Sequence, residues 1–86
     1  MWIILSYDIN EKRVNKIRKI CKQYLIRIQK SVFLGNITWA NLRILRDTLK
    51  NEIVESEDSI QFFILRDEKI IKRIKIGQSY EYSNII

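Results

Sequence analysis

Histidine and proline are absent from the 86 residues of this chain, and cysteine occurs once, as Cys21. Without histidine there is no imidazole to act as a general base or metal ligand, which excludes a serine–histidine triad. A single cysteine excludes an intrachain disulfide and a cysteine-based zinc cluster, and it is typical of a reducing cytoplasm. We therefore expect any metal site in this chain to depend on carboxylates.

Glycine and long apolar segments are also scarce. The only glycines are Gly35 and Gly77, so we expect few built-in breaks and no flexible linker. No apolar run approaches the roughly 20 residues of a membrane-spanning helix, and the N-terminus does not resemble a signal peptide. We predict a cytoplasmic protein with no membrane partner, with a single domain over residues 1–77 and a tail at residues 78–86.

Positive charge, in contrast, is in excess. Sixteen Lys and Arg residues oppose ten Asp and Glu residues, which gives a formal net charge of +6. This balance favours a polyanionic partner, and we expect nucleic acid, either DNA or RNA. A basic surface that is solvated and binds nothing specific is the alternative.

The spacing of apolar residues predicts an α+β fold. The expected strands include residues 2–7, 59–65 and 70–76. Helices are expected to begin after the N-caps Asn10 and Thr38. Between these helices, residues 25–36 form either one bent strand or two short strands with a tight turn at Gln29–Lys30.

The order of these elements is that of the split βαβ, ferredoxin-like arrangement: strand, helix, strand, strand, helix, strand. The strand at residues 70–76 is an addition to it. Both helices would cover one face of the sheet, and a chain of this size has no third layer for the other face. A symmetric homodimer, sheet against sheet, is the simplest way to cover it.

Asp8 is the main candidate for chemistry, because it follows a short buried strand directly and precedes a basic helix. Ligands of α/β layers usually bind at the carboxyl ends of strands. Asp8 could instead be a structural acid that caps the helix. As a functional residue it would bind magnesium, and two copies across a dimer axis would make a better site than one. A bound metal could acidify a water and assist phosphodiester cleavage.

The other candidates are less specific. The acidic group Glu55, Glu57 and Asp58 is expected to be a solvated loop, and Cys21 a small core residue. Tyr7 and Phe33 could stack on bases, although core packing is the expected role of both rings. Cations could hold phosphates through charge-assisted hydrogen bonds. The predicted nucleic-acid-binding residues are Lys12, Arg13, Lys16, Lys19, Arg27 and Lys30.

Taken together, these features resemble the CRISPR-associated protein two family, the small partner in spacer acquisition. The resemblance rests on Tyr7-Asp8-Ile9, the basic helix that follows, and the segment Arg-Ile-Gln-Lys-Ser-Val-Phe-Leu-Gly at residues 27–35. It extends over residues 1–77 and includes Asp58-Ser59 and the segment at residues 74–77.

This resemblance implies a ferredoxin-like homodimer in which Gln29–Lys30 is the turn of a hairpin and the final strand pairs with the other protomer. It also implies that Asp8 of each subunit lines the dimer cleft and binds Mg²⁺. The implied catalytic set is Asp8, Tyr7, Arg27, Ser31 and Phe33. Arg13 matches the family loosely, since the connection from Asp8 to the helix is shorter here.

Members of this family are described as metal-dependent nucleases for RNA or DNA, and also as non-catalytic bridges between integrase subunits. We predict a magnesium-dependent endonuclease of CRISPR spacer acquisition, most simply an endoribonuclease, with the integrase subunit as a partner. The alternative is a dimeric DNA-binding scaffold that does not need Asp8. A generic RNA-recognition domain is disfavoured because the Lys/Arg-Gly-Phe pattern is absent.

Overall fold

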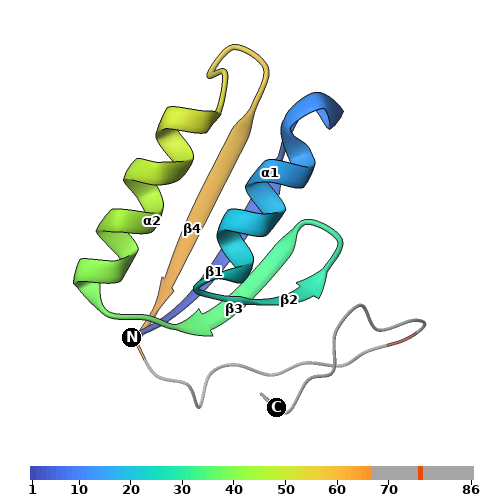
Figure 1. Ribbon diagram of the computed structural model, residues 1–86. Helices are drawn as coiled ribbons and strands as arrows, with labels where there is room; N and C mark the ends of the chain where they lie inside the picture. The colour runs from blue at the N-terminus through green and yellow to red at the C-terminus, as the bar shows by residue number, and fades with distance from the viewer. Residues whose placement is uncertain (67–75, 77–86) are drawn as a thin grey trace.

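The computed structural model describes residues 1–66 and residue 76 (Figure 1). The elements of this part are β1 (Trp2–Asp8), α1 (Glu11–Lys22), β2 (Ile26–Gln29), β3 (Val32–Asn36), α2 (Trp39–Glu52) and β4 (Ser59–Leu65). Their order confirms the predicted ferredoxin-like arrangement. The predicted strand at residues 70–76, apart from residue 76, and the tail at residues 78–86 lie outside the described residues.

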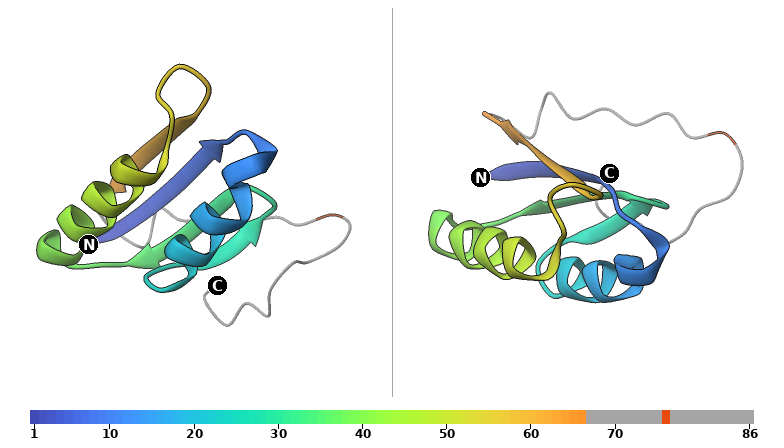
Figure 2. Two further views of the ribbon diagram at one scale, coloured as in Figure 1. Left: turned by 45° about the horizontal axis from the view of Figure 1, so that its top comes forward. Right: turned by 90° about the horizontal axis from the view of Figure 1, so that it is seen from above.

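The four strands form an antiparallel sheet in the order β2-β3-β1-β4. Both helices lie on one face of this sheet (Figure 2). Along β1, Ile3, Leu5 and Tyr7 point toward the helices and are buried, whereas Trp2 and Ile4, which alternate with them, are partly exposed on the other face. The period-2 alternation of a half-covered strand therefore fixes which side of β1 each residue occupies.

Residues 25–36 form two strands, and their turn differs from the predicted one. Gln29 pairs with Val32, so the turn residues are Lys30 and Ser31 rather than Gln29 and Lys30. The register shifts between Arg27 and Gln29, which places one extra residue in β2 and moves the turn one position along the chain. The Arg27 side chain stabilises this glycine-free turn: Nε and Nη2 donate to the Lys30 carbonyl at 3.2 and 2.9 Å.

The two helices begin where the sequence predicts. The Asn10 side chain accepts a hydrogen bond from the Lys12 amide at 3.0 Å, and the Thr38 hydroxyl accepts one from the Asn41 amide at 3.1 Å. Neither helix of the described part is long and apolar enough to cross a membrane. The helices bury a shared apolar face against the sheet, made of Ile17, Ile20, Cys21, Leu42, Leu45 and Leu49.

Cys21 is a core residue, as predicted. It is completely buried in the same cluster as Leu5 and Phe33. Burial raises the pKa of its thiol to about 12, so the side chain stays an uncharged, unreactive thiol at neutral pH.

Candidate active site

A cleft of about 380 Å³ opens at the carboxyl end of β1, between the first turns of α1 and the β2–β3 hairpin. It brings together five of the residues singled out in the sequence: Tyr7, Asp8, Arg27, Lys30 and Ser31. The sheet register explains this convergence, because Ser6 pairs with Val32 and thus places the hairpin turn beside the end of β1. The rest of the lining is Ile9, Val14, Asn15 and Arg18.

Asp8 is exposed and lines this cleft at the end of β1. Its backbone is held in the sheet opposite Ser59 of β4. Within residues 1–66, its side chain takes part in no hydrogen bond and no ion pair. The interpretation of Asp8 as a helix cap is wrong, because Asn10 caps α1.

One protomer offers only part of a magnesium site. An exposed carboxylate without a partner fits Mg²⁺, which prefers carboxylate oxygens and keeps several waters. However, the described residues contain no group of three or more acidic or cysteine side chains that could hold a metal. Of the residues that the structure describes, Asp8 is therefore the one acidic side chain that lines this cleft and could contribute a metal ligand.

Tyr7 lies under the cleft and connects β1 to the hairpin. Its amide donates to the Ser31 carbonyl at 3.0 Å, and its phenol donates to the Lys30 carbonyl at 3.4 Å. Burial raises the pKa of Tyr7, while the nearby guanidinium groups of Arg27 and Arg18 partly oppose that rise. The phenol is therefore protonated at neutral pH and can act as a hydrogen-bond donor but not as a base.

Phe33 is the one member of the predicted catalytic set that does not line the cleft. Its side chain is completely buried, so it cannot stack on a base. Its ring instead packs against Tyr7, with the ring centroids 6.0 Å apart and the planes tilted by 32°. The expected core packing of both rings is confirmed, and Phe33 can affect the cleft only through Tyr7.

Arg18 is a cleft residue that the sequence analysis missed. It lies on α1 one turn after Val14, and both residues face the cleft together with Asn15. The i, i+4 spacing from Val14 is the signal that would have found it, since such residues share one helix face. Among the described residues, the lining of the cleft therefore combines one acidic residue, Asp8, with cations from both α1 and the hairpin.

Arg13 was predicted to bind nucleic acid, but the structure commits its guanidinium to two acidic side chains. Nε and Nη2 donate to the Asp58 carboxylate at 2.6 and 3.0 Å, and Nη2 also donates to Glu57 at 3.0 Å. These hydrogen bonds raise the pKa of Arg13 above the ordinary value of a guanidinium group. Arg13 is not one of the described residues that line the cleft, and its guanidinium contacts the loop that precedes β4.

The prediction of a solvated acidic loop is wrong for Asp58. Its side chain is fully buried, whereas that of Glu57 is half exposed. The hydrogen bonds from Arg13 lower the pKa of Asp58 well below its usual range, against the opposing effect of burial. Backbone amides of Val54 and Asn10 add to this lowering.

The remaining predicted cations lie on the outer side of α1. Lys12, Lys16 and Lys19 are exposed, and none of them forms an ion pair within the described part of the chain. They share α1 with Arg18, which lines the cleft, so this helix carries exposed cations outside the cleft as well.

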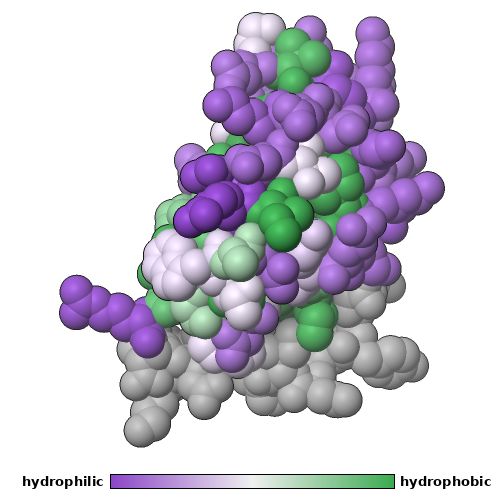
Figure 3. All heavy atoms as spheres, turned by 60° about the vertical axis from the view of Figure 1, so that its left-hand side comes forward, coloured by the Kyte–Doolittle hydropathy of each residue, from purple (hydrophilic) through white to green (hydrophobic). Residues whose placement is uncertain are grey.

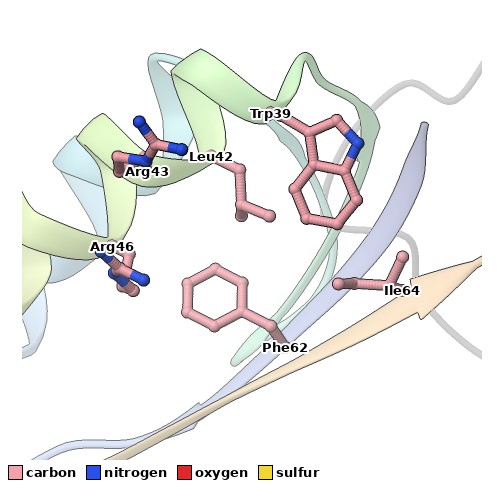
Figure 4. Close-up of a pocket in the computed structure, with 6 residues that line it drawn as sticks. All are labelled: Trp39, Leu42, Arg43, Arg46, Phe62 and Ile64. Carbon is pink, nitrogen blue, oxygen red and sulfur yellow. The ribbon is translucent and has the colours of Figure 1, made fainter.

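A second groove, of about 360 Å³, lies between α2 and β4 and has a different character (Figure 4). Its lining is apolar, with Trp39, Leu42, Phe62 and Ile64, and the rim carries Arg43 and Arg46. Figure 3 shows apolar surface interrupting the polar surface on this side of the molecule. None of the described residues that line this groove is a carboxylate, so they offer no ligand comparable to Asp8.

Comparison with known proteins agrees with this geometry. The family model described as CRISPR associated protein Cas2 matches residues 1–73. The chain belongs to the Cas2 family. One relative, the CRISPR-associated endoribonuclease Cas2 of Dictyoglomus turgidum, is 39% identical over 77 residues, which cover 90% of this chain and 88% of the relative. The protein of the same name from Methanosarcina acetivorans is 37% identical over 87 residues and covers both chains completely.

Solved Cas2 structures share the fold. One Cas2 crystal structure matches with a TM-score of 0.85 and 32% identity, over 100% of this chain and 97% of the other. Streptococcus pyogenes Cas2 at pH 6.5 matches with a TM-score of 0.75 and 29% identity, over 87% and 100% of the two chains. The resemblance found in the sequence and the ferredoxin-like fold are both confirmed.

Proposed function

We propose that this Cas2 family member is a metal-dependent endoribonuclease of CRISPR spacer acquisition, with its active site in the Asp8 cleft. The observation that carries the proposal is Asp8, which is exposed and has no side-chain partner within residues 1–66, in a cleft whose other charged lining residues in that range, Arg18, Arg27 and Lys30, are all cations. A carboxylate in such a setting is suited to hold a cation next to a bound phosphodiester. Relatives that match over nine-tenths or more of this chain carry the name endoribonuclease.

Each cleft residue has a role that follows from its position. Asp8 would hold Mg²⁺, and when bound the ion would supply an acidified water and charge stabilisation at the phosphate. Arg18, Arg27 and Lys30 bind and orient the phosphates through charge-assisted hydrogen bonds. Tyr7 keeps the hairpin turn in place through the Lys30 carbonyl, and the Ser31 hydroxyl can donate to a phosphate oxygen.

The proposal includes a homodimer that brings two copies of Asp8 together. Two features support it. The sheet face opposite the helices exposes apolar side chains, including Phe63 at 49%. In addition, β4 is at an edge of the described sheet and offers an unpaired backbone edge to another strand. Asp8 of the symmetry mate would then supply a second acidic ligand, which residues 1–66 of one protomer do not place in the cleft.

A non-catalytic scaffold that bridges integrase subunits on DNA is the second candidate. It is favoured by Lys12, Lys16 and Lys19, which are exposed outside the cleft and could bind a duplex backbone without any contribution from Asp8. Phosphate contacts of this kind position a nucleic acid without reading its sequence.

A cleavage assay separates the two candidates. Wild type and Asp8→Asn are incubated with single-stranded RNA and with duplex DNA, with Mg²⁺ or with chelator. We expect magnesium-dependent cleavage by wild type only, with duplex binding unchanged in the variant. Asp47→Asn is the matched control, because Asp47 is an exposed acid on α2 outside the cleft lining. If Asp8→Asn cleaves as well as wild type, the nuclease proposal is wrong.

A further inference from the structure

Asp58 is a buried carboxylate with a full set of hydrogen-bond donors, which come from the start of α1 and from the loop that follows α2. One oxygen, Oδ1, accepts from the Asn10 amide at 2.8 Å and from Arg13 Nη2 at 3.0 Å. The other, Oδ2, accepts from Arg13 Nε at 2.6 Å and from the Val54 amide at 2.8 Å. A single side chain thus joins the start of α1 to the loop that follows α2.

These contacts hold two segments next to Asp8, one that follows it along the chain and one that pairs with it across the sheet. Asn10 is two residues beyond Asp8, and its amide is fixed by Asp58. Ser59, the residue after Asp58, is paired opposite Asp8 in the sheet. The backbone of Asp8 is therefore held between a strand partner and a helix start that are both attached to Asp58. The Asp8 side chain itself has no such support within residues 1–66.

We infer that Asp58 is a positioning residue that sets where the Asp8 carboxylate lies in the cleft, and that Arg13 acts with it rather than as a nucleic-acid contact. This inference rests on the proposed metal-binding role of Asp8. The groups around a metal ligand orient it, and their loss typically weakens metal binding by about 10- to 100-fold. Asp58 would exert this effect through the main chain, because its partner is the Asn10 amide.

The test compares Asp58→Asn and Arg13→Gln in the full chain, with Mn²⁺ as the metal probe and binding followed by electron paramagnetic resonance. We expect both variants to bind Mn²⁺ about 10-fold more weakly than wild type. Their affinity for single-stranded RNA in chelator should stay within about twofold of wild type. Hydrogen exchange at the Asn10 amide should become faster in Asp58→Asn, since its acceptor loses the negative charge.

Glu57→Gln is the matched control. Glu57 contacts the same two residues, through Asn10 Nδ2 at 3.1 Å and Arg13 Nη2 at 3.0 Å, but its side chain is half exposed. Its Mn²⁺ affinity should equal that of wild type. The double variant Arg13→Gln with Asp58→Asn should bind Mn²⁺ only slightly more weakly than either single variant, because the two residues act as one unit.

Two results would overturn the inference. If Asp58→Asn is folded and its Asn10 amide exchanges faster while Mn²⁺ affinity is unchanged, Asp58 is only structural. If Arg13→Gln weakens RNA binding and lowers the log–log salt slope by about one charge, Arg13 is a phosphate contact. Should Asp58→Asn not fold, Arg13→Gln, which keeps the backbone hydrogen bonds of Asp58, decides the question. If wild type binds Mn²⁺ no better than Asp8→Asn, the proposed metal role of Asp8 fails instead.

Discussion

Asp8 and Asp58 are the same residue type at the same end of the β1–β4 strand pair, yet their surroundings are opposite. Asp8 is exposed and has no partner in the described part of the chain, whereas Asp58 is fully buried and accepts four hydrogen bonds. The buried carboxylate is fully occupied by donors of its own chain. The exposed one keeps its oxygens available for a ligand from outside.

The difference shows that partners, more than residue type or sequence position, decide what a carboxylate can do. A buried charge costs solvation free energy, and it is tolerated here because a guanidinium and two backbone amides replace the lost water. Such a group stabilises the fold but has no capacity left for a metal. Asp8, with its solvent-exposed charge, contributes little to the fold and is free to act.

From the contrast between Asp58 and Asp8, the largest effect that we expect is a loss of thermal stability when Asp58 is replaced. Asp58→Ala leaves the Asn10 and Val54 amides and the Arg13 guanidinium without their acceptor, which is costly for buried donors. We expect the melting temperature, measured by circular dichroism in chelator, to fall by roughly 10 °C or more. Asp47→Ala, at an exposed ion pair, should melt as wild type does. An equal fall in Asp8→Ala would contradict the contrast between the two acids.

The free energy of unfolding should depend on pH in the acid range because of Asp58. Its pKa is lowered in the folded state, so the stability it contributes is fully present above its unfolded pKa of about 3.9. That contribution is lost as the pH falls below this value toward the lowered pKa. Wild type should therefore lose stability steeply below about pH 4. Asp58→Asn, already less stable at neutral pH, should lose less over the same range, as followed by urea unfolding at each pH.

The next prediction concerns the exposed lysines of α1 and the salt dependence of RNA binding. Replacing Lys12, Lys16 and Lys19 together by Gln should lower the log–log salt slope for single-stranded RNA by about 2, since each phosphate contact contributes about 0.7. The slope is measured by fluorescence anisotropy over a salt series. An unchanged slope in the triple variant would remove α1 from the binding surface.

The smallest expected effect concerns Asp8 itself. If two copies face each other in the proposed dimer, their like charges repel each other in the absence of a cation. Asp8→Asn should then melt a few degrees higher than wild type in chelator, and Mg²⁺ should raise the melting temperature of wild type alone. Equal melting of the two proteins in chelator would indicate that the two carboxylates are far apart.

Local sequence patterns were sufficient for most of the fold and for Asp8. The N-caps, the buried helix faces and the position of Asp8 at the end of β1 depend on neighbouring residues along the chain. The hairpin turn was placed one residue too early, because the register shift in β2 follows from pairing with β3 and has no local signal.

The burial of Asp58 could not be read from the sequence for a different reason. Its surroundings, Glu55 to Glu57, are polar and resemble a solvated loop, and its decisive partner is 45 residues away in the chain. Arg18 is one of several cations on α1, and the local sequence does not distinguish it from the others; its place in the cleft beside Val14 follows from the packing of α1 near the hairpin. In both residues the tertiary contact, not the local composition, determines the role.

The separation of 45 residues between Arg13 and Asp58 also has a kinetic consequence. Because this contact closes a long loop between α1 and the residue that precedes β4, we expect it to form after the local helices and the β2–β3 hairpin. Interactions that are absent from the folding transition state slow unfolding without speeding folding. The Arg13–Asp58 ion pair is therefore expected to lower the unfolding rate, which lengthens the lifetime of the folded chain, without raising the folding rate.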